Sequence, residues 1–205
     1  MATLSVLVKA IAEVQGLDEN QVLWIARYLR EDGLISQGGR GRGGARMEVR
    51  DAVNLLLGVN APGTAKQSTA LVRTFRELRL SDDLAWFGDK TDDDWRSLQD
   101  DLDNDLVKSF YRATPFARSL ETLLKCFFDG KQPDKMVRVG LSGPEFTASI
   151  YIGAEEVERA GDVMYHVRFS EPILGVQQQQ YYPDQETSRY FTHRTLEKVA
   201  QLLLD

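Results

Sequence analysis

Apolar side chains recur along the first part of the chain with the spacing of an amphipathic helix. Leu4, Leu7, Val8 and Ile11 stand at i, i+3, i+4 and i+7, so that they share one face. This pattern predicts a helix over residues 3–15 whose apolar face is buried.

A second helix is predicted directly after a tight turn. Gly16 stands at the turn, where a positive φ is needed, and Asp18 can cap the helix that follows. Gly33 ends that helix as the residue beyond its C-terminus. The small side chain of Ala12 lets the two helices cross closely, whereas Gln15 is polar where such a pair usually has an apolar residue. This is the spacing of a helix-turn-helix.

Helical periodicity returns over residues 48–59, is broken at 61–64, and resumes over 65–78. The clearest helix of the sequence begins at Thr114-Pro115, with threonine as N-cap and proline in the first position, and ends at Gly130.

Beyond Pro133 the apolar period changes from 3.6 to 2. Alternating segments over residues 137–141 and 146–152 flank a Ser-Gly-Pro turn, which predicts a β-hairpin. Further strands are expected over 163–169 and 188–192, followed by a terminal amphipathic helix. The fold class is therefore α+β, with an antiparallel sheet in the second half. The expected divisions are an N-terminal helix-turn-helix domain, a linker helix and an α+β domain, at residues 1–60, 61–80 and 81–205.

The N-terminal part resembles the winged helix-turn-helix of transcription regulators of phage and prophage type. The resemblance covers residues 4–58 and rests on the helix pair, on the continuation L-R-E-D-G-L-I (29–35), and on the glycine- and arginine-rich segment 37–47. It implies that the second helix enters the major groove of DNA and that the segment after it forms a wing.

The resemblance gives the exposed side of the second helix a role in reading bases. Asn20 and Gln21 suit bidentate recognition of adenine, and Arg27 suits a guanine edge or a phosphate. Trp24 has two interpretations, one as a core or dimer contact and the other as a contact to a sugar or a thymine methyl group. Asp18 and Glu19 are unfavourable near phosphates. They either accept a hydrogen bond from cytosine N4 or form an N-terminal capping turn that contacts no base.

Five glycines interleave with Arg40 and Arg42 over residues 38–44. A slim cationic loop of this kind can enter a minor groove narrowed by A·T pairs. A solvated linker and an arginine–glycine segment that binds RNA are the alternatives. Arg46 and Arg50 extend the basic region. The predicted DNA-binding residues are thus Asn20, Gln21, Trp24, Arg27, Arg40, Arg42, Arg46 and Arg50.

Charge is segregated along the chain, whose net charge is −6 and whose isoelectric point is about 5.1. Residues 81–105 hold ten aspartates against Lys90 and Arg96. This stretch is interpretable as a solvated acidic face, as a surface that imitates DNA or binds a basic protein, or as a cation site. Its resemblance to a calcium loop fails because Leu106 occupies the position that requires glycine.

The sequence offers little for catalysis. His166 and His193 are both expected on strands, as hydrogen-bonded structural side chains without companions at metal-ligand spacing. The single cysteine, Cys126, is expected to be a small buried hydrophobe. Neither a phosphate-binding loop nor a G-x-S-x-G motif occurs. We therefore expect no enzyme activity, no cofactor and no metal.

The function favoured by the sequence is a sequence-specific DNA-binding transcription regulator. Two-fold symmetric recognition would need a homodimer, and the second half would dimerise or contact RNA polymerase or another protein. The alternative is a phage-type interaction factor, either a small packaging subunit or an inhibitor of a host nucleic-acid machine, that acts through residues 81–105. No apolar run approaches the length of a membrane span and no signal peptide is apparent, so a cytoplasmic protein is expected.

Overall fold

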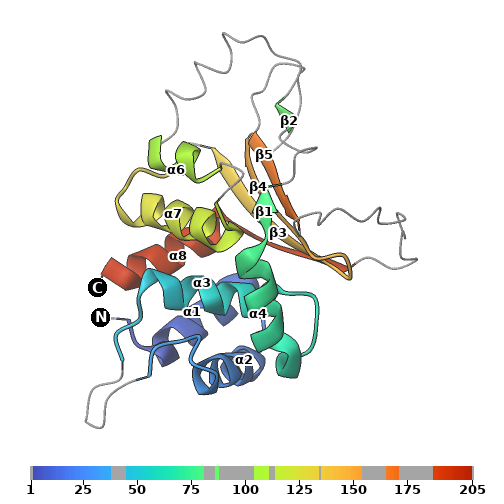
Figure 1. The fold of residues 1–205 in the computed structure, drawn as a ribbon. Helices are drawn as coiled ribbons and strands as arrows, with labels where there is room; N and C mark the ends of the chain where they lie inside the picture. Colours follow the sequence, from blue (N-terminus) through green and yellow to red (C-terminus); the bar gives the residue numbers. More distant parts are fainter. Residues whose placement is uncertain are drawn as a thin grey trace.

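The fold combines helices with one antiparallel sheet (Figure 1). It is seen in a computed structural model that describes residues 2–37, 45–80, 86–87, 104–110, 114–133, 135–153, 165–170 and 187–204. The α+β class predicted from the sequence is confirmed.

The first two helices meet at the predicted turn. Helix α1 (Leu4–Gln15) ends at Gly16, whose φ of 64° lies in the left-handed region. Helix α2 (Glu19–Glu31) begins after Asp18, whose carboxylate accepts a hydrogen bond from the Gln21 backbone N–H at 2.9 Å. Ala12 is buried in the core, and α1 packs against α2.

After residues 38–44, which lie outside the described residues, the helices α3 (Val49–Asn60) and α4 (Ser68–Glu77) continue the helical part, with a 3₁₀ turn (Ala65–Gln67) between them. A capping box between Glu48 and Asp51 starts α3. The predicted wing residues Arg40 and Arg42 lie outside the described residues. The described chain on either side, 32–37 and 45–48, forms no strand.

The sheet has the strand order β1-β5-β4-β3-β6, with β2 also paired to β5, and every pairing is antiparallel. The predicted hairpin joins the two central strands, with Val139 opposite Ile150. The alternation of its buried and more exposed side chains confirms the period of two that the sequence predicts. The strands are β1 (Arg79–Leu80), β2 (Trp86–Phe87), β3 (Met136–Gly143), β4 (Thr147–Gly153), β5 (Tyr165–Ser170) and β6 (Thr187–Thr192).

Three further helices, α6 (Asn104–Ser109), α7 (Phe116–Phe128) and α8 (His193–Leu204), lie on one side of the sheet (Figure 1). Two sequence predictions are wrong in detail here. Pro115, not Thr114, is the N-cap of α7, because its backbone is still extended with ψ of 146°. His193 begins α8 instead of ending a strand.

One hydrophobic core connects the helical part with the sheet. Its buried side chains extend from Ala2 to Leu203, and α1 packs directly against α8. The helix predicted as a linker contributes Phe75, which meets Phe146 edge-on with ring centroids 5.7 Å apart. Cys126 is buried in the core, as predicted. The three segments expected from the sequence therefore share a single interior.

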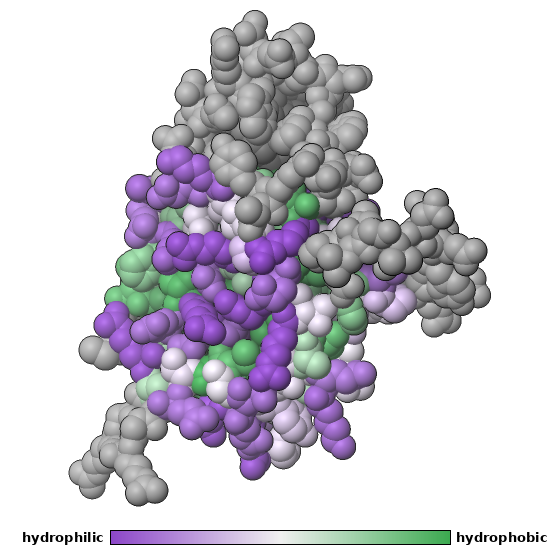
Figure 2. Space-filling model, viewed as in Figure 1, coloured by the Kyte–Doolittle hydropathy of each residue, from purple (hydrophilic) through white to green (hydrophobic). Residues whose placement is uncertain are grey.

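The surface seen in Figure 2 is largely hydrophilic over the described helices, with small apolar patches between the polar side chains. None of the helices within the described ranges is both long enough and apolar enough to cross a bilayer.

A polar network lies inside the helical layer. The amide of the fully buried Asn54 donates a hydrogen bond to the carbonyl of Leu34 and accepts one from the guanidinium of Arg76. The same guanidinium binds the Glu121 carboxylate at 3.2 Å, where both side chains are less than a fifth exposed. The network thereby connects the end of the α2 segment, α3, α4 and α7.

Replacing Asn54 with leucine should destabilise the fold by about 2–4 kcal/mol, because the Leu34 carbonyl and one side of the Arg76 guanidinium lose their buried partner. The measurement is urea unfolding followed by circular dichroism. The control is Glu31→Gln, which breaks an ion pair that is more than half exposed and should cost at most about 0.5 kcal/mol. Equal losses in both variants would contradict the structural role of the network.

Candidate nucleic-acid interface

The outer face of α2 is exposed to solvent, whereas its inner face is buried. Val22, Ile25, Ala26 and Leu29 are buried against the neighbouring helices. The residues at positions 20, 23, 24 and 27 share the opposite face because of the helical period. All are exposed: Asn20, Leu23 (48%), Trp24 (51%) and Arg27, together with the neighbouring Gln21.

Trp24 and Arg27 form the most distinctive pair on this face. The guanidinium lies 5.4 Å from the centroid of the indole ring, within the range of a cation–π contact. The Arg27 Nε also donates a hydrogen bond to Glu31 at 2.9 Å. Both members of this ion pair are more than half exposed, so that a stronger anion could replace the Glu31 carboxylate at small cost.

Carboxylates flank the same face. Glu19 stands in the first turn of α2, and Glu31 and Asp32 stand at its end. Asp32 binds Arg73 of α4 at 2.6 Å. Any polyanion that approaches α2 therefore has to fit between acidic groups, and this favours a defined orientation over indiscriminate binding.

The predicted site residues divide into three groups. Asn20, Gln21, Trp24 and Arg27 lie together on α2. Arg46 and Arg50 are exposed, one in the extended chain before α3 and the other in its first turn. The third group, Arg40 and Arg42, lies outside the described residues.

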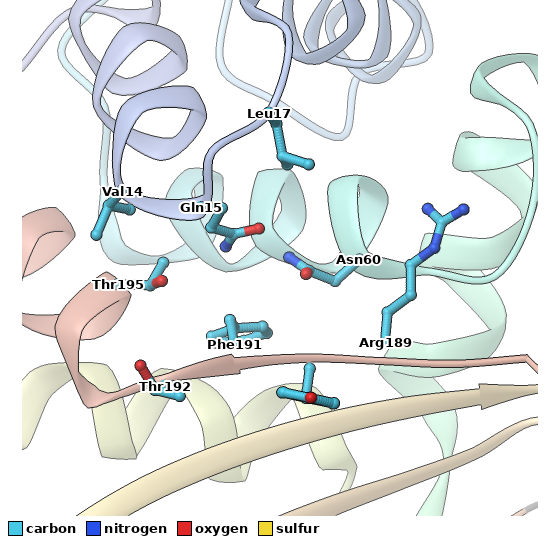
Figure 3. Close-up of a pocket in the computed structure, with 9 residues that line it drawn as sticks. Val14, Gln15, Leu17, Asn60, Arg189, Phe191, Thr192 and Thr195 are labelled. Atoms are coloured by element: carbon cyan, nitrogen blue, oxygen red, sulfur yellow. The ribbon is translucent and has the colours of Figure 1, made fainter.

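A pocket of about 350 Å³ lies where the helical part meets the sheet (Figure 3). The C-terminal ends of α1 and α3, the strand β6 and the first turn of α8 form its walls. Apolar and polar side chains mix in the lining: Val14, Gln15, Leu17, Asn60, Arg189, Tyr190, Phe191, Thr192 and Thr195.

Two amides belong to the polar part of this lining. Asn60 is buried, and its amide N–H donates to the Leu56 carbonyl at 3.0 Å. The Nε2 of Gln15 is buried without a hydrogen-bond partner among the described residues. A buried unpaired donor costs free energy, so a small ligand with an acceptor atom would gain by pairing with it. The sequence had indicated that this position is unusual, because Gln15 is polar where a helix-turn-helix usually has an apolar residue.

The two histidines have different environments. His166 lies on β5, where partial burial of its imidazole and then the positive charge of Arg168 lower its pKa below the usual value. The Nδ1 of His193 is buried without a hydrogen-bond partner in the described part of the chain, so the prediction of a hydrogen-bonded structural histidine is wrong for this atom. No cluster of histidine, cysteine and acidic side chains that could hold a metal occurs among the described residues.

The acidic stretch 81–105 falls mostly outside the described residues. Of its aspartates the structure describes Asp105, an exposed residue of α6 that lies 3.9 Å from Lys108. The backbone of residues 86–87 is also described, and it pairs with β5. The three interpretations of this stretch stay predictions.

Comparison of the chain with protein families, with curated proteins and with solved structures found no match.

Proposed function

We propose that this protein is a sequence-specific DNA-binding transcription regulator. The observation that carries the proposal is the division of α2 into a buried face and an exposed one. The exposed face combines amides, an aromatic ring and a guanidinium within two helical turns. These are the side chains that read base edges when a helix lies in a major groove.

In this proposal each residue of α2 has a distinct role. Asn20 and Gln21 pair with adenine edges, and Arg27 contacts a guanine edge or a phosphate after it leaves Glu31. Trp24 packs against a sugar or a thymine methyl group. The arginines that follow contact the backbone and the adjoining minor groove, at positions 40, 42, 46 and 50.

A second role of the same face is contact with another copy of the chain. Leu23 and Trp24 are large apolar side chains, each about half exposed, and they adjoin one another. Burial between two subunits would remove them from water. Dimerisation through a different surface would instead leave both α2 helices free to bind a two-fold symmetric site. The partner, the target sequence and the direction of regulation belong to the proposal and to its tests.

Substitution of the reading residues should weaken specific binding. We expect Asn20→Ala and Arg27→Ala each to lower the affinity for a selected duplex by about 5- to 150-fold, with specificity relaxed at one base position. The duplex, of about 20 base pairs, is first selected from a random pool. Binding is measured by fluorescence anisotropy.

The control for these substitutions is Arg118→Ala, which removes an exposed arginine from α7. Unchanged binding in both α2 variants would refute the proposed reading face. A Trp24→Ala variant that loses affinity only because it becomes monomeric, as judged by sedimentation, would assign the face to dimerisation.

Removal of a flanking carboxylate should have the opposite effect. Glu31→Gln releases Arg27 and removes a negative charge near the phosphates, so we expect about two- to fivefold tighter binding to the same duplex. The gain should shrink as salt is raised, because both effects are electrostatic. Weaker binding, in a variant that unfolds at the same urea concentration as the parent, would show that Glu31 itself contacts a base.

The arginine loop should act mainly through phosphates. We expect Arg40→Gln with Arg42→Gln to lower affinity for specific and unrelated duplexes alike. The slope of log affinity against log salt should become shallower by about 1 for each arginine. The salt titration distinguishes phosphate contacts from base recognition. If the slope of log affinity against log salt is unaltered, residues 38–44 are a linker that does not contact DNA.

A further inference from the structure

The sheet has a second face, which points away from the helical layer. Along each strand, every second side chain points into the core, and the side chains between them lie on this second face. The register of the strands aligns these residues in rows across the sheet. One row runs across four strands from Tyr190 through Gly140 and Ser149 to Arg168. A second row, on one side of the first, consists of Thr192, Arg138, Tyr151 and His166. A third row, on the other side, consists of Ser188, Ser142, Thr147 and Ser170.

The charged strand residues described on this face are arginines: Arg138, Arg168 and Arg79, which lies opposite Ser170 and pairs with Glu77 at 3.6 Å. None of the described strand residues is an aspartate or a glutamate. The guanidinium groups of Arg138 and Arg168 pair with no carboxylate in the part of the chain that the structure describes. A face of this kind in a chain with net charge −6 attracts an anionic partner locally.

Aromatic rings accompany these cations. The Arg138 guanidinium lies 5.1 Å from the centroid of the Tyr190 ring, and this ring belongs to a residue that is 63% exposed. On the neighbouring strands, the Tyr151 ring meets the His166 ring edge-on, with centroids 6.4 Å apart. An exposed tyrosine beside an arginine offers a flat surface on which a planar group can stack.

A hollow of about 260 Å³ lies beside these rings. Its lining consists of Ala148 and of groups able to donate hydrogen bonds: Ser142, Thr147, Ser149, His166 and Arg168. A Cβ atom at Gly140 would lie 2.8 Å from the Ser149 hydroxyl, so that a side chain there would displace this hydroxyl of the hollow. Hydroxyl groups around a guanidinium form a suitable environment for the oxygen atoms of a phosphate.

We propose that this outer face of the sheet binds single-stranded nucleic acid, with a backbone phosphate in the hollow and a base stacked on Tyr190. The row from Tyr190 to Arg168 spans three inter-strand steps, about 14 Å in all, and so can contact more than one nucleotide. A single strand presents both phosphates and free base faces. A duplex hides its base faces, which would leave the tyrosine without a partner.

This site is separate from the proposed reading face on α2. An acidic peptide would satisfy the arginines but would not use the exposed ring, and therefore nucleic acid fits the whole face better. The hydroxyl groups of the hollow can contact RNA or DNA, and a comparison of the two strands in one experiment decides between them.

The test is fluorescence anisotropy of the full chain with labelled oligouridylate and oligodeoxythymidylate of about 15 nucleotides. We expect Tyr190→Ala to weaken binding of the preferred strand by about 5- to 150-fold, and Tyr190→Phe to keep most of the affinity because stacking needs only the ring. Arg168→Ala should also make the salt slope shallower by about 0.7.

The matched control is Arg118→Ala, which removes an exposed arginine from α7, on the opposite side of the sheet. This variant should bind the single strands as the parent does. Failure of the parent to bind either strand, equal losses in the Phe and Ala variants of Tyr190, or tighter capture of a labelled oligoglutamate would each overturn the proposal. Arg27→Ala tests binding of the duplex by α2, whereas Tyr190→Ala tests binding of the single strand by the sheet. The result for one proposed site therefore does not decide the other.

Discussion

The buried network of Asn54, Arg76 and Glu121 is the constraint on which the arrangement of the helices depends. An arginine inside a protein is tolerated only when a carboxylate and further acceptors surround it, and here the partners come from α3 and α7. The Asn54 amide also holds the Leu34 carbonyl, just after α2. Directional bonds of this kind fix one relative position of the elements, which apolar packing alone specifies less sharply.

This constraint has a consequence for α2. Its inner residues pack against α3, where a Cβ atom on Gly58 would lie 2.9 Å from the Leu29 side chain. Close contact on one side and the polar network nearby leave α2 little freedom to tilt. A helix held in this way presents its exposed side chains in a fixed arrangement, so that the proposed binding of DNA would cost little ordering entropy.

Local patterns in the sequence predicted most of the fold. The alternation over residues 137–152 identified the central hairpin, and Gly16, Asp18 and Gly130 marked helix ends, because these features depend only on neighbouring residues. The pairing of Arg76 with Asn54 and Glu121 was not predictable, since its members are distant in sequence. Likewise, the outer sheet face emerged only when the strand register aligned residues from four strands in rows. Of the candidate site, the exposed face of α2 followed from helical periodicity, whereas the pocket beside Gln15 depends on the approach of β6.

The contact between α1 and α8 determines when the hydrophobic core can be completed during folding. The interior that α1 shares with the sheet is completed only when α8 has been synthesised. Until then the apolar side of α1 has only its nearest helical neighbours to cover it. Contacts between such distant segments slow folding, because a long loop of chain must first be brought together. During synthesis the apolar side of α1 therefore stays incompletely covered until α8 can pack against it.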